Sequence, residues 1–156
     1  SHGQEADDEL GINQTSSTIV CSLDKDLLMI PGKHFNWTKQ QYGDLTFVSP
    51  EGGAKHFWKQ MLIGDKADNI HGVAGLGPVK SGKLIDCLES EEECLDVIIE
   101  KYEHDYRRVA MNAACLWIKR SEDSEWHKDL DLILPAPLQL EVDTMSESMK
   151  HFMDSI

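Results

Sequence analysis

The spacing of hydrophobic positions changes along the chain, from short extended runs before residue 50 to helical spacing after it. Positions 18–22 form a β-branched apolar run that predicts a buried strand. Positions 34–37 and 45–48 flank Tyr42-Gly43-Asp44 and predict a small hairpin. Positions 5–12 favour a helix with acidic residues in its first turn, and 27–30 an apolar turn or short helix. We therefore expect a mixed α/β amino-terminal part.

The second part of the chain has apolar residues at helical spacing, which begins with Phe57, Trp58, Met61 and Leu62. Further helices are predicted over 79–88, 91–102 and 105–118. We expect 50–53 to be a break between elements and Pro135-Ala136-Pro137 to interrupt any helix. This divides the chain into an α/β part at 1–49, a helical module at 50–120 and an acidic tail at 121–156.

Composition and charge narrow the class of protein. The 156 residues are 40% hydrophobic and 28% charged, an ordinary globular balance. No apolar run approaches the roughly 18–20 residues that span a bilayer, and the amino terminus is polar, so neither a membrane span nor a signal peptide is predicted. The four cysteines form no C-x-x-C pair, which argues against zinc, and we expect reduced, mostly buried thiols.

Three clusters of acidic residues are candidates for a metal site. Their carboxylates are hard oxygen ligands that suit Mg²⁺ or Mn²⁺, and two such ions can promote phosphodiester hydrolysis. In a chain with 28 acidic residues some pairs arise by chance, so any single pair is weak evidence. The clusters consist of Glu5, Asp7 and Asp8, of Asp24 and Asp26, and of Asp65 and Asp68.

A glycine-containing loop at 72–77 follows the third acidic cluster. Glycines allow positive φ and close backbone approach, and Pro78 suits the first turn of a helix, so the loop leads into a helix N-terminus that can receive an anion. The alternative is an ordinary corner between two helices. Candidate contacts to a phosphate backbone are Gly72, Val73, Gly75, Gly77, Lys80, Ser81 and Lys83.

Other patterns are weaker. Residues 77–83 match G-x-x-x-x-G-K, but Leu84 replaces the Ser or Thr of a P-loop and no buried strand precedes it, so an NTPase is disfavoured. We interpret Phe57, Trp58 and Trp117 as core residues rather than base-stacking platforms. The scattered histidines form no recognisable site.

The three acidic segments resemble, in order, those of the flap endonuclease or 5′-nuclease superfamily. The segments are Glu5-Ala6-Asp7-Asp8, Ser22-Leu23-Asp24-Lys25-Asp26-Leu27 and the stretch 64–77. The chain looks like the phage 5′–3′ exonuclease branch and is similar to the 5′-nuclease domain of bacterial DNA polymerase I, over roughly residues 5–90.

The resemblance implies a fold, an activity and ligands. The fold would be α/β, with part of a PIN-like core followed by a helix–three-turn–helix DNA-binding module. The activity would be 5′–3′ exonuclease and structure-specific flap endonuclease cleavage of DNA in replication or repair, in the cytoplasm of a bacterium or phage-infected host. The cofactors would be two Mg²⁺ or Mn²⁺ ions held by the seven carboxylates above, with Asp8, Asp24, Asp26, Asp65 and Asp68 also catalytic. A K⁺ ion would bind the carbonyls of the glycine loop.

This chain departs from the family pattern in two ways. His71 stands where the family often has proline, and the Glu-Ala-Asp-Asp segment, which lies mid-chain in the family, comes at the start here. We therefore expect a carboxy-terminal portion, with an amino-terminal fragment of the same nuclease as a partner alongside branched or 5′-ended DNA.

The net charge of −13 is unusual for a DNA-binding protein. Bound cations would offset some of it, and basic residues of a missing half would offset more; otherwise the acidity is solvated surface. Two alternatives stay open, namely a non-catalytic duplex-DNA-binding module and a PIN-type ribonuclease.

Overall fold

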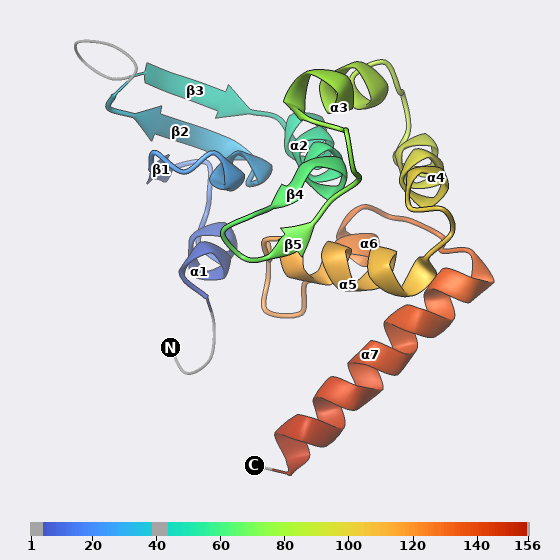
Figure 1. Cartoon of the computed structure of the whole chain (residues 1–156). Helices are drawn as coiled ribbons and strands as arrows, with labels where there is room; N and C mark the ends of the chain where they lie inside the picture. The colour runs from blue at the N-terminus through green and yellow to red at the C-terminus, as the bar shows by residue number, and fades with distance from the viewer. Residues whose placement is uncertain (1–4, 39–43, 156) are drawn as a thin grey trace.

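The computed structural model describes residues 5–38 and 44–155, which form a small sheet beside a larger group of helices (Figure 1). The predicted mixed α/β class is confirmed. In chain order the elements are α1 (Ala6–Ile12), β1 (Ile19–Cys21), the 3₁₀ helix η1 (Asp26–Met29), β2 (Gly32–Asn36), β3 (Asp44–Val48), α2 (Pro50–Ile63), β4 (Gly64–Asp65), β5 (Ile70–His71), α3 (Pro78–Ile85), α4 (Glu91–Lys101), α5 (Tyr106–Leu116), α6 (Trp126–Asp129) and α7 (Ala136–Asp154).

The sheet has the strand order β1-β2-β3, with β1 parallel to β2 and β2 antiparallel to β3. The β2–β3 pair confirms the predicted hairpin, although its turn at 39–43 lies outside the described residues. Val20 and His34 pair and are buried, whereas Ile19, Leu45 and Phe47 are 48%, 61% and 70% exposed. One face of the sheet therefore meets the core and the other carries uncovered apolar side chains.

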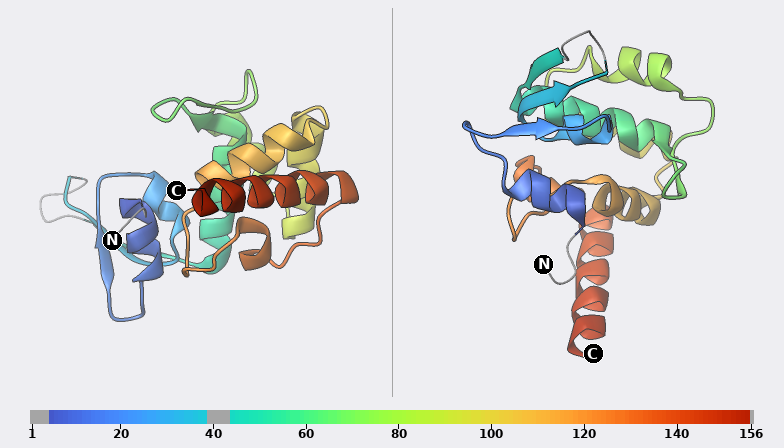
Figure 2. Two further views of the ribbon diagram at one scale, coloured as in Figure 1. Left: turned by 90° about the horizontal axis from the view of Figure 1, so that it is seen from below. Right: turned by 90° about the vertical axis from the view of Figure 1, so that its left-hand side faces the viewer.

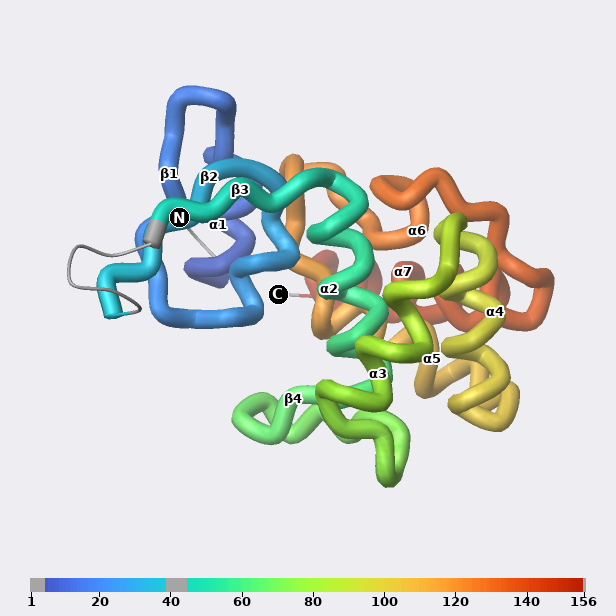
Figure 3. The backbone as a smooth tube through the Cα atoms, turned by 90° about the horizontal axis from the view of Figure 1, so that it is seen from above, coloured from blue at the N-terminus to red at the C-terminus, as the bar shows by residue number. Residues whose placement is uncertain are grey.

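Helix α2 is the centre of the molecule, with η1, α3, α4 and α5 packed around it (Figure 3). It begins at Pro50, so the predicted break at 50–53 was wrong. Ser49 accepts a hydrogen bond from the Gly52 amide at 3.0 Å and caps the helix, and Pro50 suits its first turn.

The core is aromatic at its middle. Phe57 and Trp58 are fully buried, and Trp117 and Trp126 pack on them with ring centroids 5.0 Å from Phe57 and 6.3 Å from Trp58, respectively. The interpretation of Phe57, Trp58 and Trp117 as core is confirmed. The cysteines differ from expectation, because Cys21, Cys87 and Cys115 are exposed and Cys94 alone is buried; all four are free thiols.

The carboxy-terminal segment is folded rather than an acidic tail. Trp126, Leu130 and Leu138 belong to the core, and Pro135-Ala136-Pro137 begins α7 instead of interrupting a helix. Proline fits this position because the first helical N–H groups have no acceptor within the helix. Helix α7 packs on α5 and then extends away from the body (Figure 2). Within the described ranges, no helix combines the length and apolar character needed to cross a bilayer.

Candidate functional site

Five carboxylates from three separate segments lie on one side of the molecule. Asp7 is on α1, Asp24 and Asp26 lie between β1 and η1, and Asp65 and Asp68 belong to β4 and its turn into β5. In Figure 1 the turn of the β4–β5 hairpin points toward the side of the molecule on which α1 lies. The structure thus brings one member of the first acidic segment together with both members of the other two.

The carboxylates are close enough to act on one another electrostatically. Partial burial, and then the charges of Asp24, Asp8 and Asp68, raise the pKa of Asp7. Partial burial, and then the charges of Asp24, Asp65, Asp7 and Asp68, raise the pKa of Asp26. Asp7 and Asp26 therefore each lie in a field that disfavours the ionised carboxylate and that a cation would relieve.

Local hydrogen bonds orient three of these side chains. Asp24 Oδ1 accepts from the Asp26 amide at 2.9 Å, and Asp65 Oδ1 accepts from the Ala67 amide at 2.8 Å. Asp26 Oδ1 accepts from Gln60 Nε2 on α2. In each case no hydrogen bond to the other carboxylate oxygen is found in the described part of the chain.

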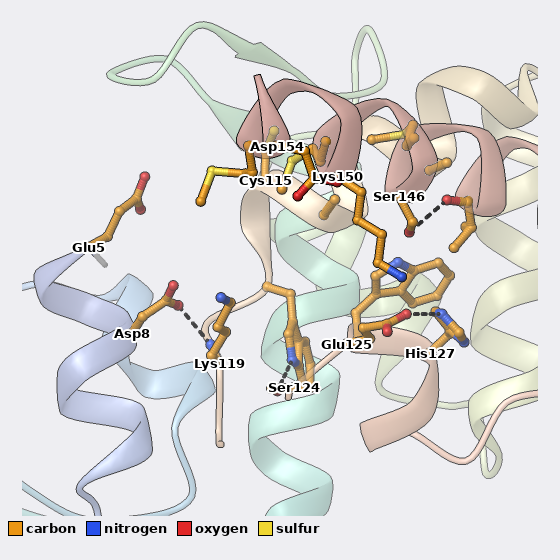
Figure 4. A pocket seen from close by; sticks show the side chains of 18 residues that line it. Glu5, Asp8, Cys115, Lys119, Ser124, Glu125, His127, Ser146, Lys150 and Asp154 are labelled. Atoms are coloured by element: carbon orange, nitrogen blue, oxygen red, sulfur yellow. Dashed lines mark hydrogen bonds and ion pairs between the residues drawn. The ribbon is translucent and has the colours of Figure 1, made fainter. Parts of the chain in front are cut away.

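Glu5 and Asp8 are placed differently from the rest of the predicted set. Both line a cavity of about 670 Å³ formed with α5, α6 and α7, and that cavity includes none of the other five aspartates (Figure 4). Asp8 Oδ1 accepts from the Lys119 amide at 2.9 Å. Asp8 thus connects α1 to the segment after α5, which is a structural role.

The chemistry of the donors suits a hard divalent cation, since all five are carboxylates. Their present arrangement is open: among residues 5–38 and 44–155, no three acidic, histidine or cysteine side chains lie close enough to enclose an ion. Mg²⁺ retains several waters when protein-bound, so carboxylates that are spread apart can hold it partly through water.

The glycine loop begins at a close crossing of two backbone segments. A Cβ on Gly72 would lie 2.4 Å from Leu62 O, and one on Gly64 would lie 2.3 Å from Gly72 N. The Val73 amide also donates to Leu62 O at 2.8 Å. Gly72 is therefore required by internal packing, against the end of α2.

Gly75 and Gly77 have different surroundings. Gly75 has a φ of +79°, and at both positions an added Cβ would meet nothing within 4 Å. Gly77 is the N-cap of α3 with extended backbone, a conformation open to other residues. Neither packing nor backbone geometry within the described protein requires glycine at position 77, so the loop offers an open backbone surface at the start of α3.

The predicted polar contacts of α3 divide into two groups. Lys80 and Lys83 are exposed, and no ion pair with either is found among the residues described. Ser81 is fully buried, and its Oγ has no hydrogen-bond partner there. Its hydroxyl cannot reach a ligand at the surface, so the two lysines alone remain as candidate phosphate contacts from this helix.

Three polar residues that the sequence did not single out hold the start of the loop. Arg108 Nη2 donates to the carbonyls of His71, at 3.0 Å, and Gly72. Asn112 Nδ2 donates to His71 O at 2.9 Å and to Tyr102 Oη at 3.0 Å, and Tyr102 Oη donates to Met61 O. Arg108 and Asn112 are four residues apart beside the apolar stripe of the predicted helix 105–118, and that spacing was the available signal.

The carbonyls of the loop are unequally engaged. Those of His71 and Gly72 accept from Arg108 and Asn112, and that of Val73 accepts from the Leu76 amide at 3.1 Å. A K⁺ ion at this loop would rely mainly on carbonyls beyond Val73.

Comparison with protein-family models, with curated proteins and with solved structures gave no match.

Proposed function

We propose that this chain belongs to a metal-dependent nuclease of the 5′-nuclease type, which cleaves DNA at 5′ ends or branched junctions. One observation carries the proposal: carboxylates from three segments act electrostatically on Asp7 and Asp26 beside the β4–β5 hairpin, and that hairpin leads into the open glycines Gly75 and Gly77 before α3.

The two parts of this site suit different parts of a DNA substrate. Gly75, Gly77 and the first amides of α3 would receive a phosphate of the duplex, with Lys80 and Lys83 adding positive charge. Asp7, Asp24, Asp26, Asp65 and Asp68 would hold two divalent ions. When bound, such ions supply activated water and stabilise the leaving oxygen. The hairpin, together with the side chains that hold it, would set the distance from the bound phosphate to the cleaved one, so cleavage would follow DNA shape rather than sequence.

The open sheet supports a second polypeptide as partner. Ile19, Leu45 and Phe47 leave an apolar face uncovered, and no strand pairs with the outer edge of β1 in the described protein. Exposed strand edges and apolar faces are typical of interaction surfaces. We propose that the amino-terminal fragment of the nuclease covers this face.

A non-catalytic duplex-binding module is the second candidate. It is favoured by the position of Glu5 and Asp8 on the cavity beside α7 and by the absence, in the part of the chain described, of three converging ligands. A PIN-type ribonuclease would share the carboxylates but would prefer RNA.

The test measures binding and cleavage of 5′-flap DNA, with a matched RNA, in Mg²⁺ and in EDTA. Asp24→Asn should reduce Mg²⁺-dependent cleavage at least 100-fold while binding persists, because Asn keeps the hydrogen bond to the Asp26 amide but removes a charge. Asp96→Asn, an exposed change on α4, is the control. Cleavage at the wild-type rate in Asp24→Asn would refute the metal assignment, and duplex binding without cleavage would select the second candidate.

Gly77→Ala tests the proposed phosphate contact at the start of α3 in the same assay. An added methyl meets no protein atom, so Tm should change little, but it would obstruct a close phosphate. We expect at least a fivefold loss of duplex affinity. Unchanged affinity would place the DNA elsewhere.

A further inference from the structure

Side chains of α5 donate hydrogen bonds to the backbone where the β4–β5 hairpin joins the glycine loop at 72–77. The hairpin itself is minimal, since β4 and β5 pair through only two residue pairs, Gly64 with His71 and Asp65 with Ile70. Such a short ladder gives little rigidity alone. The position of the loop therefore depends on what holds the carbonyls of His71 and Gly72.

Arg108 and Asn112 supply that support. One guanidinium nitrogen of Arg108 donates to both carbonyls, and the Asn112 amide nitrogen donates to the first. Asn112 is fixed in turn by Tyr102, which is 2% exposed and donates to Met61 O in the last turn of α2. The junction and the end of α2 are thus connected through one hydrogen-bonded group.

Arg108 is itself held firmly. Its Cζ lies 4.8 Å from the centre of the Tyr102 ring, and its amide donates to Asp105 Oδ1, the cap of α5, at 3.1 Å. A charged donor strengthens hydrogen bonds to neutral carbonyls. Lysine would not reproduce this contact, because its ammonium nitrogen ends one bond short of the position of Nη2 and lacks the planar face that lies over the Tyr102 ring.

We propose that Arg108 and Asn112 are positioning residues, which set the glycine loop relative to Asp65 and Asp68 by holding the backbone at residues 71 and 72. The role in DNA binding rests on the proposed function. The mechanical part, that these side chains fix the loop, does not depend on it.

The mechanical part is tested by hydrogen exchange of the loop amides at 72–77. Arg108→Ala should accelerate their exchange at least tenfold, and Asn112→Ala should do so to a lesser extent. Arg107→Ala is the matched control, because Arg107 is the exposed neighbour on the same helix. Loop exchange equal to wild type in Arg108→Ala would overturn the proposal, whether or not the chain binds DNA.

Duplex affinity, measured well below Tm, tests the functional part. Arg108→Ala should weaken binding about tenfold and Arg107→Ala less than threefold. Arg108→Lys keeps the charge but not the bridge, so it should restore little; full restoration would overturn positioning in favour of charge alone.

A double variant separates the remaining outcomes. If Arg108 acts through the loop, Arg108→Ala should reduce duplex affinity little further in a protein that already carries Gly77→Ala. A fully additive loss of affinity in the double variant would count against the proposal. If wild type fails to bind any duplex while Arg108→Ala still loosens the loop, the proposed function fails and the positioning role stands.

Discussion

Asp26 shows how several neighbouring carboxylates act on a single residue. Burial and four neighbouring carboxylates raise its pKa above the ordinary 3.8, so the fold disfavours its charged form. The charge of Asp26 therefore lowers the free energy of unfolding, by its full amount at pH values above the raised pKa. This loss shrinks as pH falls through that pKa. It disappears below 3.8, where Asp26 is protonated in both the folded and the unfolded state.

Replacing Asp26 with asparagine should therefore stabilise the metal-free protein at neutral pH. We expect a rise in Tm of about 1–3 °C in EDTA, small because solvent screens half-exposed charges. The amide oxygen can still accept from Gln60. Thermal unfolding from pH 7 to 3 checks this: the gain should shrink as pH falls, whereas Asp96→Asn should show none. Saturating Mg²⁺ should favour wild type instead. A pH-independent loss of stability would contradict the electrostatic explanation.

The sequence predicted candidate site residues only where the signal lay in residue type and local spacing. The aspartates were identified by charge and spacing, and the charges of Asp24, Asp65 and Asp68 do act on Asp7 or Asp26. No three of them lie close enough to enclose an ion in the described part of the chain. The different placement of Asp8 depends on the Lys119 amide, 111 residues away, and the burial of Ser81 depends on how α3 packs. Neither contact leaves a trace in the neighbouring sequence.

At the level of elements, helices with apolar spacing were predicted well, and Pro78 was correctly expected in the first turn of α3. The starts of α2 and α7 were not predicted. Both α2 and α7 start at positions expected to be breaks, because proline stops a preceding helix but also suits the first turn of a following one. The spacing after each proline, Phe57 to Leu62 and Leu138 to Val142, was the better guide.

We expect the two halves of α7 to contribute unequally to the free energy of unfolding. Leu138 is fully buried against the body, whereas Met149, Phe152 and Met153 are 66–70% exposed. Ending the chain after Ser146 should leave the free energy of unfolding within about 1 kcal/mol of wild type, but Leu138→Ala should lower it by about 2–5 kcal/mol. Urea unfolding measures both. A large loss on truncation would mean that the outer half of α7 packs in solution.

For the whole molecule, charge and the proposed ligand conflict, because a chain of −13 must bind a polyanion. The conflict is reduced if binding relies on few cations at one place and on divalent ions at the carboxylates. Affinity for duplex should then be modest and should depend weakly on monovalent salt.

Lys83→Ala tests whether α3 supplies one of these few cationic contacts to the duplex. It should reduce the slope of log affinity against log salt by about 0.9, the value for one lost phosphate contact. Lys101→Ala, on α4 and paired with Glu100 at 3.0 Å, should leave the slope unchanged. Equal slopes for both variants and wild type would remove α3 from the contact surface.

The aromatic core has a consequence for spectroscopy. Trp58, Trp117 and Trp126 gather around Phe57, while Trp37 stands apart and is 52% exposed. Three of the four indoles therefore lie in one buried cluster, and we expect their closely packed rings to give near-ultraviolet dichroism that is lost when this cluster opens. With Trp37 exchanged for phenylalanine, the intrinsic fluorescence would report on α2 and its neighbours alone. The protein thus contains its own optical probe for every stability measurement proposed above.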